Sequence, residues 1–192
     1  MIFLFLPVSR YNEIKHEVLF MYEECEVTSL PIDCFEIARK LYYHLVPYSQ
    51  LSDRALRQAM QYSSDGFSSI RKNPYTGMYE WFIFYNDFNS LPRQRWTIFH
   101  EIGHIYLGHF EDYTMSYAQK ESEANFFAKY SIAPPPLINM VECESATDVA
   151  DMFYVSGEAS IYIFSYFQKW KYYGEPEYEP FELELLQLFN VA

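Results

Sequence analysis

The segment from Arg93 to Phe110 carries two histidines and a glutamate within a strongly apolar stretch. Its apolar residues recur at helical spacing, and they are Ile98, Phe99, Ile102, Ile105 and Leu107. A helix of this composition has to be buried, and unpaired His and Glu side chains are costly in a buried place. The fold therefore has to provide partners for His100, Glu101 and His104.

The spacing of these three residues is the spacing of a zinc site. On a helix His100 and His104 lie about 40° apart on one face, so both imidazoles can reach one ion. Glu101 lies beside them, where its carboxylate can accept a proton from water rather than bind the metal. A five-residue match also occurs by chance on solvated helices. Here Gly103 argues against chance, because it lowers helix propensity by roughly 1 kcal/mol relative to Ala and thus indicates close packing by another element.

A third ligand has to come from another part of the chain, and His109 is the first to be considered. Gly108 and His109 follow His104 by four and five residues, whereas the metzincin pattern requires Gly and His at three and six. On a continuing helix His109 would also point about 140° away from His104. We therefore expect an exposed or helix-terminal position for His109.

Two glutamates on the next expected helix, residues 116–130, are better candidates. Glu121 and Glu123 lie about 200° apart on a helix, so only one of them can face the metal. Glu123 stands at the edge of the apolar stripe formed by Ala124, Phe127 and Ala128. We expect Glu123 to be the third ligand, with Glu121 as the alternative. Both can also be solvated charges.

Two motifs stand in register in the central part of the chain. They are Arg95-Trp96-Thr97-Ile98-Phe99-His100-Glu101-Ile102-Gly103-His104 and Glu123-Ala124-Asn125-Phe126-Phe127-Ala128. Together they resemble the ImmA/IrrE family of bacterial and phage metallopeptidases over about Ile83 to Pro134. Trp96 and the exit Tyr130-Ser131-Ile132-Ala133-Pro134 depart from the family's pattern. The resemblance implies that His100, His104 and Glu123 hold zinc and that Glu101 is the general base, as in thermolysin-type enzymes.

The resemblance also implies an activity and a partner. Members of this family often act on a helix-turn-helix transcriptional repressor, so the expected function is that of a zinc-dependent endopeptidase that cleaves or inactivates such a repressor. The edge of a small sheet would take the substrate as an added strand. The alternative is a non-catalytic regulatory module that binds a protein and retains the zinc site.

The predicted elements give an α+β fold. Strand-like runs at 67–72 and 78–86 flank Asn73-Pro74-Tyr75-Thr76-Gly77, which predicts a β-hairpin, and a short strand is expected at 46–50. Apolar periodicity predicts helices at 11–24, 32–45, 52–62, 93–110, 116–130, 147–154, 158–171 and 181–189. We expect a mostly helical zincin-like domain at 1–140, with a small antiparallel sheet beside the His-Glu-x-x-His helix. A C-terminal helical extension at 141–192 would pack on it.

Residues 148–160 within this extension resemble, weakly, a helix-turn-helix core. Reading DNA would require hydrogen-bond donors along 158–166. That stretch offers Ser, Ile, Tyr and Phe, and Lys169 and Lys171 come only after it. Core packing or partner binding is the favoured role.

Charge, cysteine content and hydrophobic runs indicate the class of partner and the cellular location. The chain has 26 acidic and 14 basic side chains and a formal net charge of −12, which disfavours nucleic acid as a partner. Cys25, Cys34 and Cys143 are widely spaced and predict reduced, buried thiols. No apolar run approaches the roughly 18 to 20 residues of a membrane helix, and residues 1–8 lack the features of a secretory signal. We expect a cytoplasmic protein.

Overall fold

The computed structural model describes residues 6–174 and 177–189. Their elements form two compact units, one from residues 6 and 33–128 and one from residues 7–32 and 129–189. This grouping differs from the expected division at residue 140. The N-terminal helix α1 (Val8–Glu24) packs on the last helix, α9 (Pro180–Phe189), through ring contacts such as His16 with Phe181. Helix α1 therefore groups with the C-terminal helices.

The first unit contains a three-stranded mixed sheet. Strand β2 (Gly66–Lys72) and strand β3 (Tyr79–Tyr85) form the predicted antiparallel hairpin. Strand β1 (His44–Pro47) pairs with β3 in parallel, so the order is β1-β3-β2 and β2 lies at an edge. The expected antiparallel sheet thus gains a parallel strand. The turn of the hairpin is closed by Asn73, whose side chain accepts hydrogen bonds from the Tyr75 and Thr76 amides.

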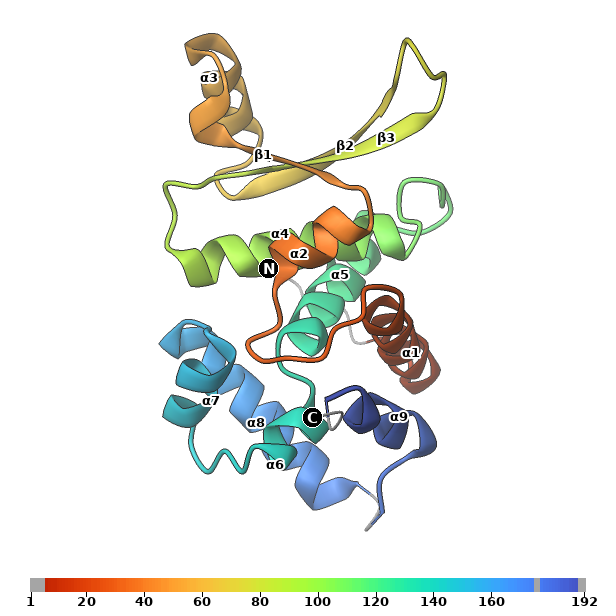
Figure 1. Cartoon of the computed structure of the whole chain (residues 1–192), viewed down its shortest axis with the longest axis vertical. Helices are drawn as coiled ribbons and strands as arrows, with labels where there is room; N and C mark the ends of the chain where they lie inside the picture. The colour runs from red at the N-terminus through yellow and green to blue at the C-terminus, as the bar shows by residue number, and fades with distance from the viewer. Residues whose placement is uncertain (1–5, 175–176, 190–192) are drawn as a thin grey trace. The chain divides into compact units, whose positions relative to one another are not determined.

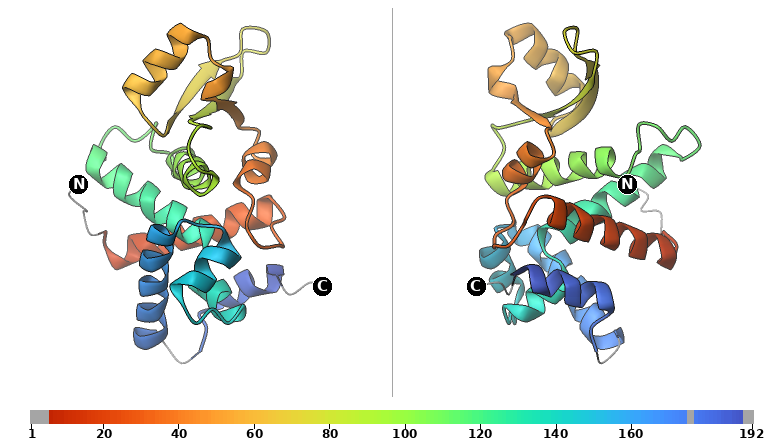
Figure 2. Two further views of the ribbon diagram at one scale, coloured as in Figure 1. Left: turned by 90° about the vertical axis from the view of Figure 1, so that its left-hand side faces the viewer. Right: turned by 45° about the vertical axis from the view of Figure 1, so that its right-hand side comes forward.

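Each face of this sheet is covered by a different helix. Helix α4 (Leu91–Tyr106) lies along one face, where it contacts β2 and β3, and helix α3 (Asp53–Tyr62) lies on the other. Figures 1 and 2 show α3 and α4 on opposite sides of the strands. Under α3 the side chains of Tyr48, Ala59 and Phe84 form a small core. The alternation of β3 side chains between the two faces follows from the period of two in a strand.

Helix α4 is held to the sheet at its first turns by Asp65, the residue before β2. Both Asp65 carboxylate oxygens accept hydrogen bonds from the Arg93 guanidinium, at 2.8 and 2.7 Å. This hydrogen bonding is the main cause of the lowered pKa of Asp65. Asn86, directly after β3, donates to the Ser64 carbonyl, and its backbone amide donates to the Asp65 carbonyl. These contacts fix where α4 starts beneath the hairpin.

The expected helix at 32–45 is shorter in the structure. Helix α2 spans Cys34–Lys40 and is capped by Asp33, whose side chain accepts from the Phe35 and Glu36 amides. The chain then turns at Tyr42, which adopts a positive φ of 59°, and continues as β1. The expected strand at 46–50 therefore begins two residues earlier and ends in the short 3-10 helix Tyr48–Gln50.

The second unit is helical in its described part. The expected pair at 147–154 and 158–171 is confirmed as α7 (Ala146–Phe153) and α8 (Gly157–Tyr173), which pack on each other. A capping box of Ser145 and Asp148 starts α7. The proline run at 134–136 separates α5 (Tyr117–Ile132) from α6 (Pro135–Met140), because proline is tolerated in the first turn of a helix but not in its interior.

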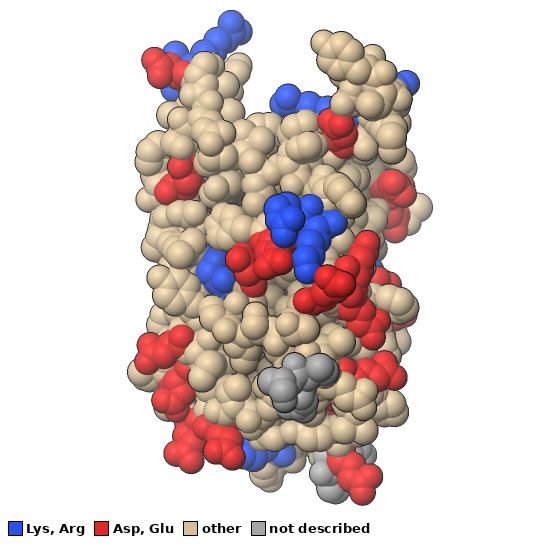
Figure 3. All heavy atoms as spheres, in the orientation of Figure 1, with Lys and Arg blue, Asp and Glu red and all other residues tan. Residues whose placement is uncertain are grey.

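Acidic and basic side chains are interspersed on the surface. On the face drawn in Figure 3, basic side chains near the centre lie close to acidic ones. Glu36 forms ion pairs with Arg39 and Lys40. Cys25, Cys34 and Cys143 are buried, as predicted. Within residues 6–174 and 177–189, the helices all fall short of the length and apolar character that a membrane span requires.

Gly66 provides a test of the contact between the sheet and α4. A Cβ at this position would lie 2.6 Å from the Phe84 carbonyl oxygen and 2.6 Å from the Thr97 Cγ2. We expect Gly66→Ala to lower the free energy of unfolding by about 1 to 3 kcal/mol, because the backbone has to move to relieve the overlap. Urea unfolding measures this change. Gly157→Ala is the matched control, since no atom lies within 4 Å of its added Cβ. Equal stabilities of the two variants would contradict the inferred close approach.

Candidate metal centre

Helix α4 presents the three residues of the His-Glu-x-x-His motif at the centre of the first unit. Its buried face includes Ile98, Phe99 and Ile102, which confirms the predicted burial of this helix. Glu101 is buried on the sheet side, where the Ser68 hydroxyl of β2 donates to its carboxylate at 2.6 Å. Glu101 is therefore the residue of the motif that contacts the edge strand β2.

The two histidines of the motif and one glutamate of α5 converge on a single point. The Nε2 atoms of His100 and His104 are 3.0 Å apart. Carboxylate oxygens of Glu121 lie 3.2 Å from the His104 Nε2 and 3.6 Å from the His100 Nε2. Ligand atoms about 2.0 to 2.1 Å from a tetrahedral zinc ion are separated by about 3.3 Å. These separations fit one ion, and among the described residues His100, His104 and Glu121 are the group that could hold a metal.

Glu123, the expected third ligand, lies elsewhere. Its side chain is fully buried, as its place beside the apolar stripe indicated, but its carboxylate contacts His109 at 3.2 Å and Gln119 at 3.2 Å. The structure thus brings together Glu121, the alternative, with the two histidines. The physical reason is that α5 is buried on more than one side. The side that carries Glu123 packs around His109, while the half-buried side that carries Glu121 faces the histidine pair.

His109 follows the C-terminal end of α4, as one of the two expected alternatives has it, but it is buried rather than exposed. It is only 3 % exposed, and its Nδ1 lies 3.0 Å from the Nδ1 of His104. The expected angle of about 140° between His104 and His109 applies only to a continuing helix. Instead, α4 ends at Tyr106 and the chain turns at Gly108, with a φ of +69°. This left-handed turn, which glycine adopts readily, directs His109 back toward His104.

Gly103 explains how α4 and α5 come so close together. A Cβ at this position would lie 3.0 to 3.1 Å from side-chain atoms of Phe127 on α5. The predicted close packing at Gly103 is thereby confirmed, with Phe127 as its partner. The absence of a side chain at residue 103 lets α5 approach the histidine face of α4.

Burial and neighbouring charges set the protonation of the site. Burial, followed by the neighbouring His104, lowers the pKa of His100 to about 4, so this imidazole is neutral near pH 7, the form that binds a metal. Burial raises the pKa of Glu101, against the hydrogen bond from Ser68. For Glu121, burial acts upward, but the polar contact with His104 and the electrostatic interaction with both histidines leave its pKa lowered. The site thus holds a neutral imidazole, a stronger base and a carboxylate.

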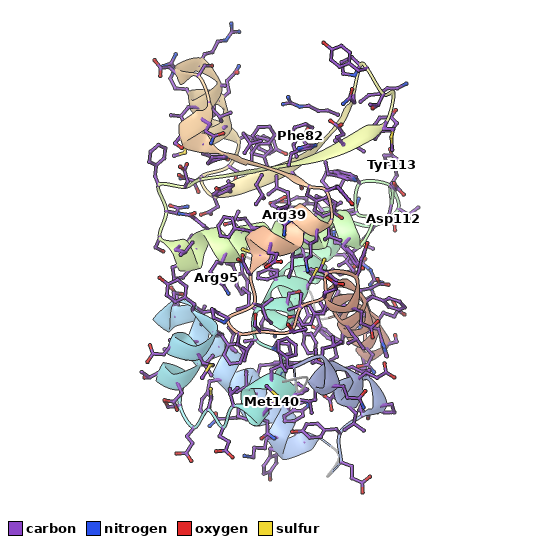
Figure 4. All side chains as sticks on the ribbon, in the orientation of Figure 1. Arg39, Phe82, Arg95, Asp112, Tyr113 and Met140 are labelled. Carbon is purple, nitrogen blue, oxygen red and sulfur yellow. The ribbon has the colours of Figure 1, made fainter. Side chains whose placement is uncertain are left out.

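Tyr117 is a further polar residue that the sequence analysis did not single out. It stands one helical turn before Glu121 and hydrogen-bonds to it, and burial and the Glu121 charge raise its pKa. The sequence also offers Tyr106, Tyr113, Tyr130 and Arg95 as hydrogen-bond donors that could stabilise an oxyanion. Arg95 points away from the sheet and Tyr113 extends from the loop after α4 (Figure 4), and Tyr130 lies about 13 Å further along α5 than Glu121. The spacing of four residues between Tyr117 and Glu121 was the signal that could have identified Tyr117.

Replacing Glu121 tests the ligand set. In Glu121→Gln an amide replaces the carboxylate, and we expect zinc affinity to fall by more than about 100-fold, beyond the loss typical of outer-shell partners. Competition with a chromophoric chelator measures this affinity. Glu111→Gln, an exposed Glu in the loop after α4, should bind zinc as the unmodified protein does. The ligand set would be wrong if Glu121→Gln kept its zinc affinity while Glu123→Gln lost more than about 100-fold. Glu123 would then be the third ligand.

No curated protein matches the chain. The profile of a peptidase family, described as the IrrE N-terminal-like domain, matches residues 58–160, which are more than half of the 192 residues. The matched range includes β2, β3, α4 and α5 and therefore every residue of the candidate metal centre. The chain belongs to the IrrE N-terminal-like peptidase family, the ImmA/IrrE family that the motifs resemble.

Proposed function

We propose that this protein is a zinc-dependent endopeptidase. The observation that supports this proposal is the convergence of His100, His104 and Glu121 on one point, with the buried Glu101 carboxylate on the same helix. Two imidazoles and one carboxylate are one of the ligand sets of catalytic zinc sites, which keep a fourth position open for water or substrate. When bound there, zinc would polarise the scissile carbonyl and lower the pKa of water toward 7.

Glu101 is the proposed general base. Its raised pKa makes it a stronger base than an ordinary carboxylate, which suits proton transfer near neutral pH. It would take a proton from the attacking water and pass it to the leaving amine. Ser68 holds one carboxylate oxygen of Glu101 in place through its 2.6 Å hydrogen bond.

The edge strand supports the binding of an extended peptide. In the order β1-β3-β2, strand β2 has its second edge outside the sheet, and its Ser68 contacts Glu101. A substrate added as a further strand along β2 would pass beside the general base. Main-chain hydrogen bonds would then give affinity, as in other cases of strand addition.

The proposed substrate is a helix-turn-helix transcriptional repressor. This step rests on analogy with the family rather than on a residue of the site. The net charge of −12 favours a protein over a nucleic acid as the partner. The rival proposal is a regulatory module that binds the same repressor without cleaving it, with zinc in a structural role.

Glu101→Gln separates these two proposals. We expect the variant to keep the zinc affinity of the unmodified protein but to cleave about 10²- to 10⁴-fold more slowly, because the general base is lost. The test uses the zinc-loaded chain and the helix-turn-helix protein encoded nearest to its gene, with intact-mass analysis of the products. Glu111→Gln should cleave normally.

Two results would decide against catalysis. If Glu101→Gln releases the repressor from DNA as well as the unmodified protein does, the proposal of a regulatory module is correct. If the purified chain binds no zinc at all, the metallopeptidase proposal fails.

A further inference from the structure

A chain of hydrogen-bonded side chains leads from the buried Glu123 to the ligand His104. The Glu123 Oε2 lies 3.2 Å from the His109 Nε2, and the His109 Nδ1 lies 3.0 Å from the His104 Nδ1. Glu123 and His109 are almost completely buried, at 0 % and 3 % exposure. Neither belongs to the group that converges on the metal position. The chain ends at the ring nitrogen of His104 opposite to the one that faces His100 and Glu121.

The chemistry of the three groups gives this chain one direction. A carboxylate only accepts hydrogen bonds, and a neutral imidazole has one donor and one acceptor nitrogen. The Nε2–H of His109 therefore donates to Glu123, which leaves the His109 Nδ1 as an acceptor. The Nδ1–H of His104 donates to that atom, and the lone pair of His104 is then on Nε2. This is the nitrogen that lies beside His100 and Glu121.

The reverse direction would disable the site. It would place the hydrogen of His104 on Nε2, where a metal ligand needs a lone pair. With a neutral His109, the carboxylate of Glu123 at the far end favours the first direction, because it takes the Nε2–H of His109. We propose that Glu123 and His109 are positioning residues that hold His104 in the tautomer and ring orientation required for metal binding. This inference rests on the proposed zinc site and deepens it.

Both ends of the chain are themselves held in place. The His109 backbone amide donates to the His104 carbonyl at 3.0 Å, and the His109 carbonyl accepts from the Lys120 ammonium group. At the other end the Gln119 amide donates to the second Glu123 oxygen at 3.2 Å. Metal-binding histidines usually donate their second ring N–H to a carboxylate or carbonyl. Here His109 stands between the ligand His104 and the carboxylate of Glu123 and contacts both.

Zinc affinity and the geometry of the bound metal test the inference independently of peptidase activity. Glu123→Gln keeps the shape of the side chain but removes the acceptor-only group, and we expect about 10-fold weaker zinc binding. The double variant His109→Phe with Glu123→Leu removes both residues that support His104. It does not leave a buried carboxylate without its histidine partner. For it we expect a loss of about 10- to 100-fold, the range for outer-shell partners of metal ligands. Glu111→Gln is the control and should bind as the unmodified chain does.

Cobalt(II) and unfolding measurements separate positioning from stability. The visible absorption of the cobalt-loaded chain reports ligand geometry, and we expect it to change in both variants. Unfolding of the metal-free proteins in urea measures any purely structural contribution. Variants that are less stable but retain the zinc affinity and the cobalt spectrum of the unmodified chain would overturn the inference.

The same series distinguishes this inference from the proposed function. If the unmodified chain binds zinc and the variants bind it equally well, only the positioning role fails. If the unmodified chain binds no zinc, both fail.

Discussion

The close approach of α4 and α5 is the contact on which the metal centre depends. At Gly103 a Cβ would lie about as near to Phe127 as side-chain contacts ever come, 3.0 to 3.1 Å. Metal–ligand distances tolerate changes of only about 0.2 Å. Gly103, although it weakens the helix locally, thus permits the helix spacing at which Glu121 oxygens lie 3.2 and 3.6 Å from the Nε2 atoms of His104 and His100.

Helix α4 separates the chemistry of the site into sides. Toward the sheet, Ser68 of β2 holds Glu101, and toward α5, Glu121 meets the two histidines. From the end of the helix, His109 returns to contact His104. The base and the two histidines share α4, but each meets a different neighbour: β2 at Glu101, α5 at the Nε2 atoms of the histidines, and the turn after α4 at the Nδ1 of His104.

Burial has opposite effects on the groups of the site, and both suit the proposed chemistry. It disfavours the charged form of every group, so the pKa of His100 falls while that of Glu101 rises. The imidazole is thereby available as a neutral ligand and the carboxylate becomes a better base. At Glu121 the nearby histidines outweigh burial and keep the pKa low. Burial, together with the neighbouring charges, thus gives a neutral ligand at His100, a stronger base at Glu101 and an ionised ligand at Glu121.

The sequence by itself determined the elements that carry the site. The hairpin, the buried helix with His100, Glu101 and His104, the close contact at Gly103 and the burial of Glu123 all follow from local patterns, because strand alternation, helix period and glycine cost are local properties. The choice between Glu121 and Glu123 could not be made from the sequence, since a hydrophobic stripe indicates burial but not which neighbour a buried carboxylate meets.

The tertiary structure also decided the place of His109 and the grouping of α1 with the C-terminal helices. His109 depends on the path of the chain after Gly108, where a single left-handed residue changes the direction of everything that follows. The grouping of α1 depends on its contact with α9, more than 150 residues further along the chain. Both are long-range or directional facts, and spacing along a single helix contains no information about them.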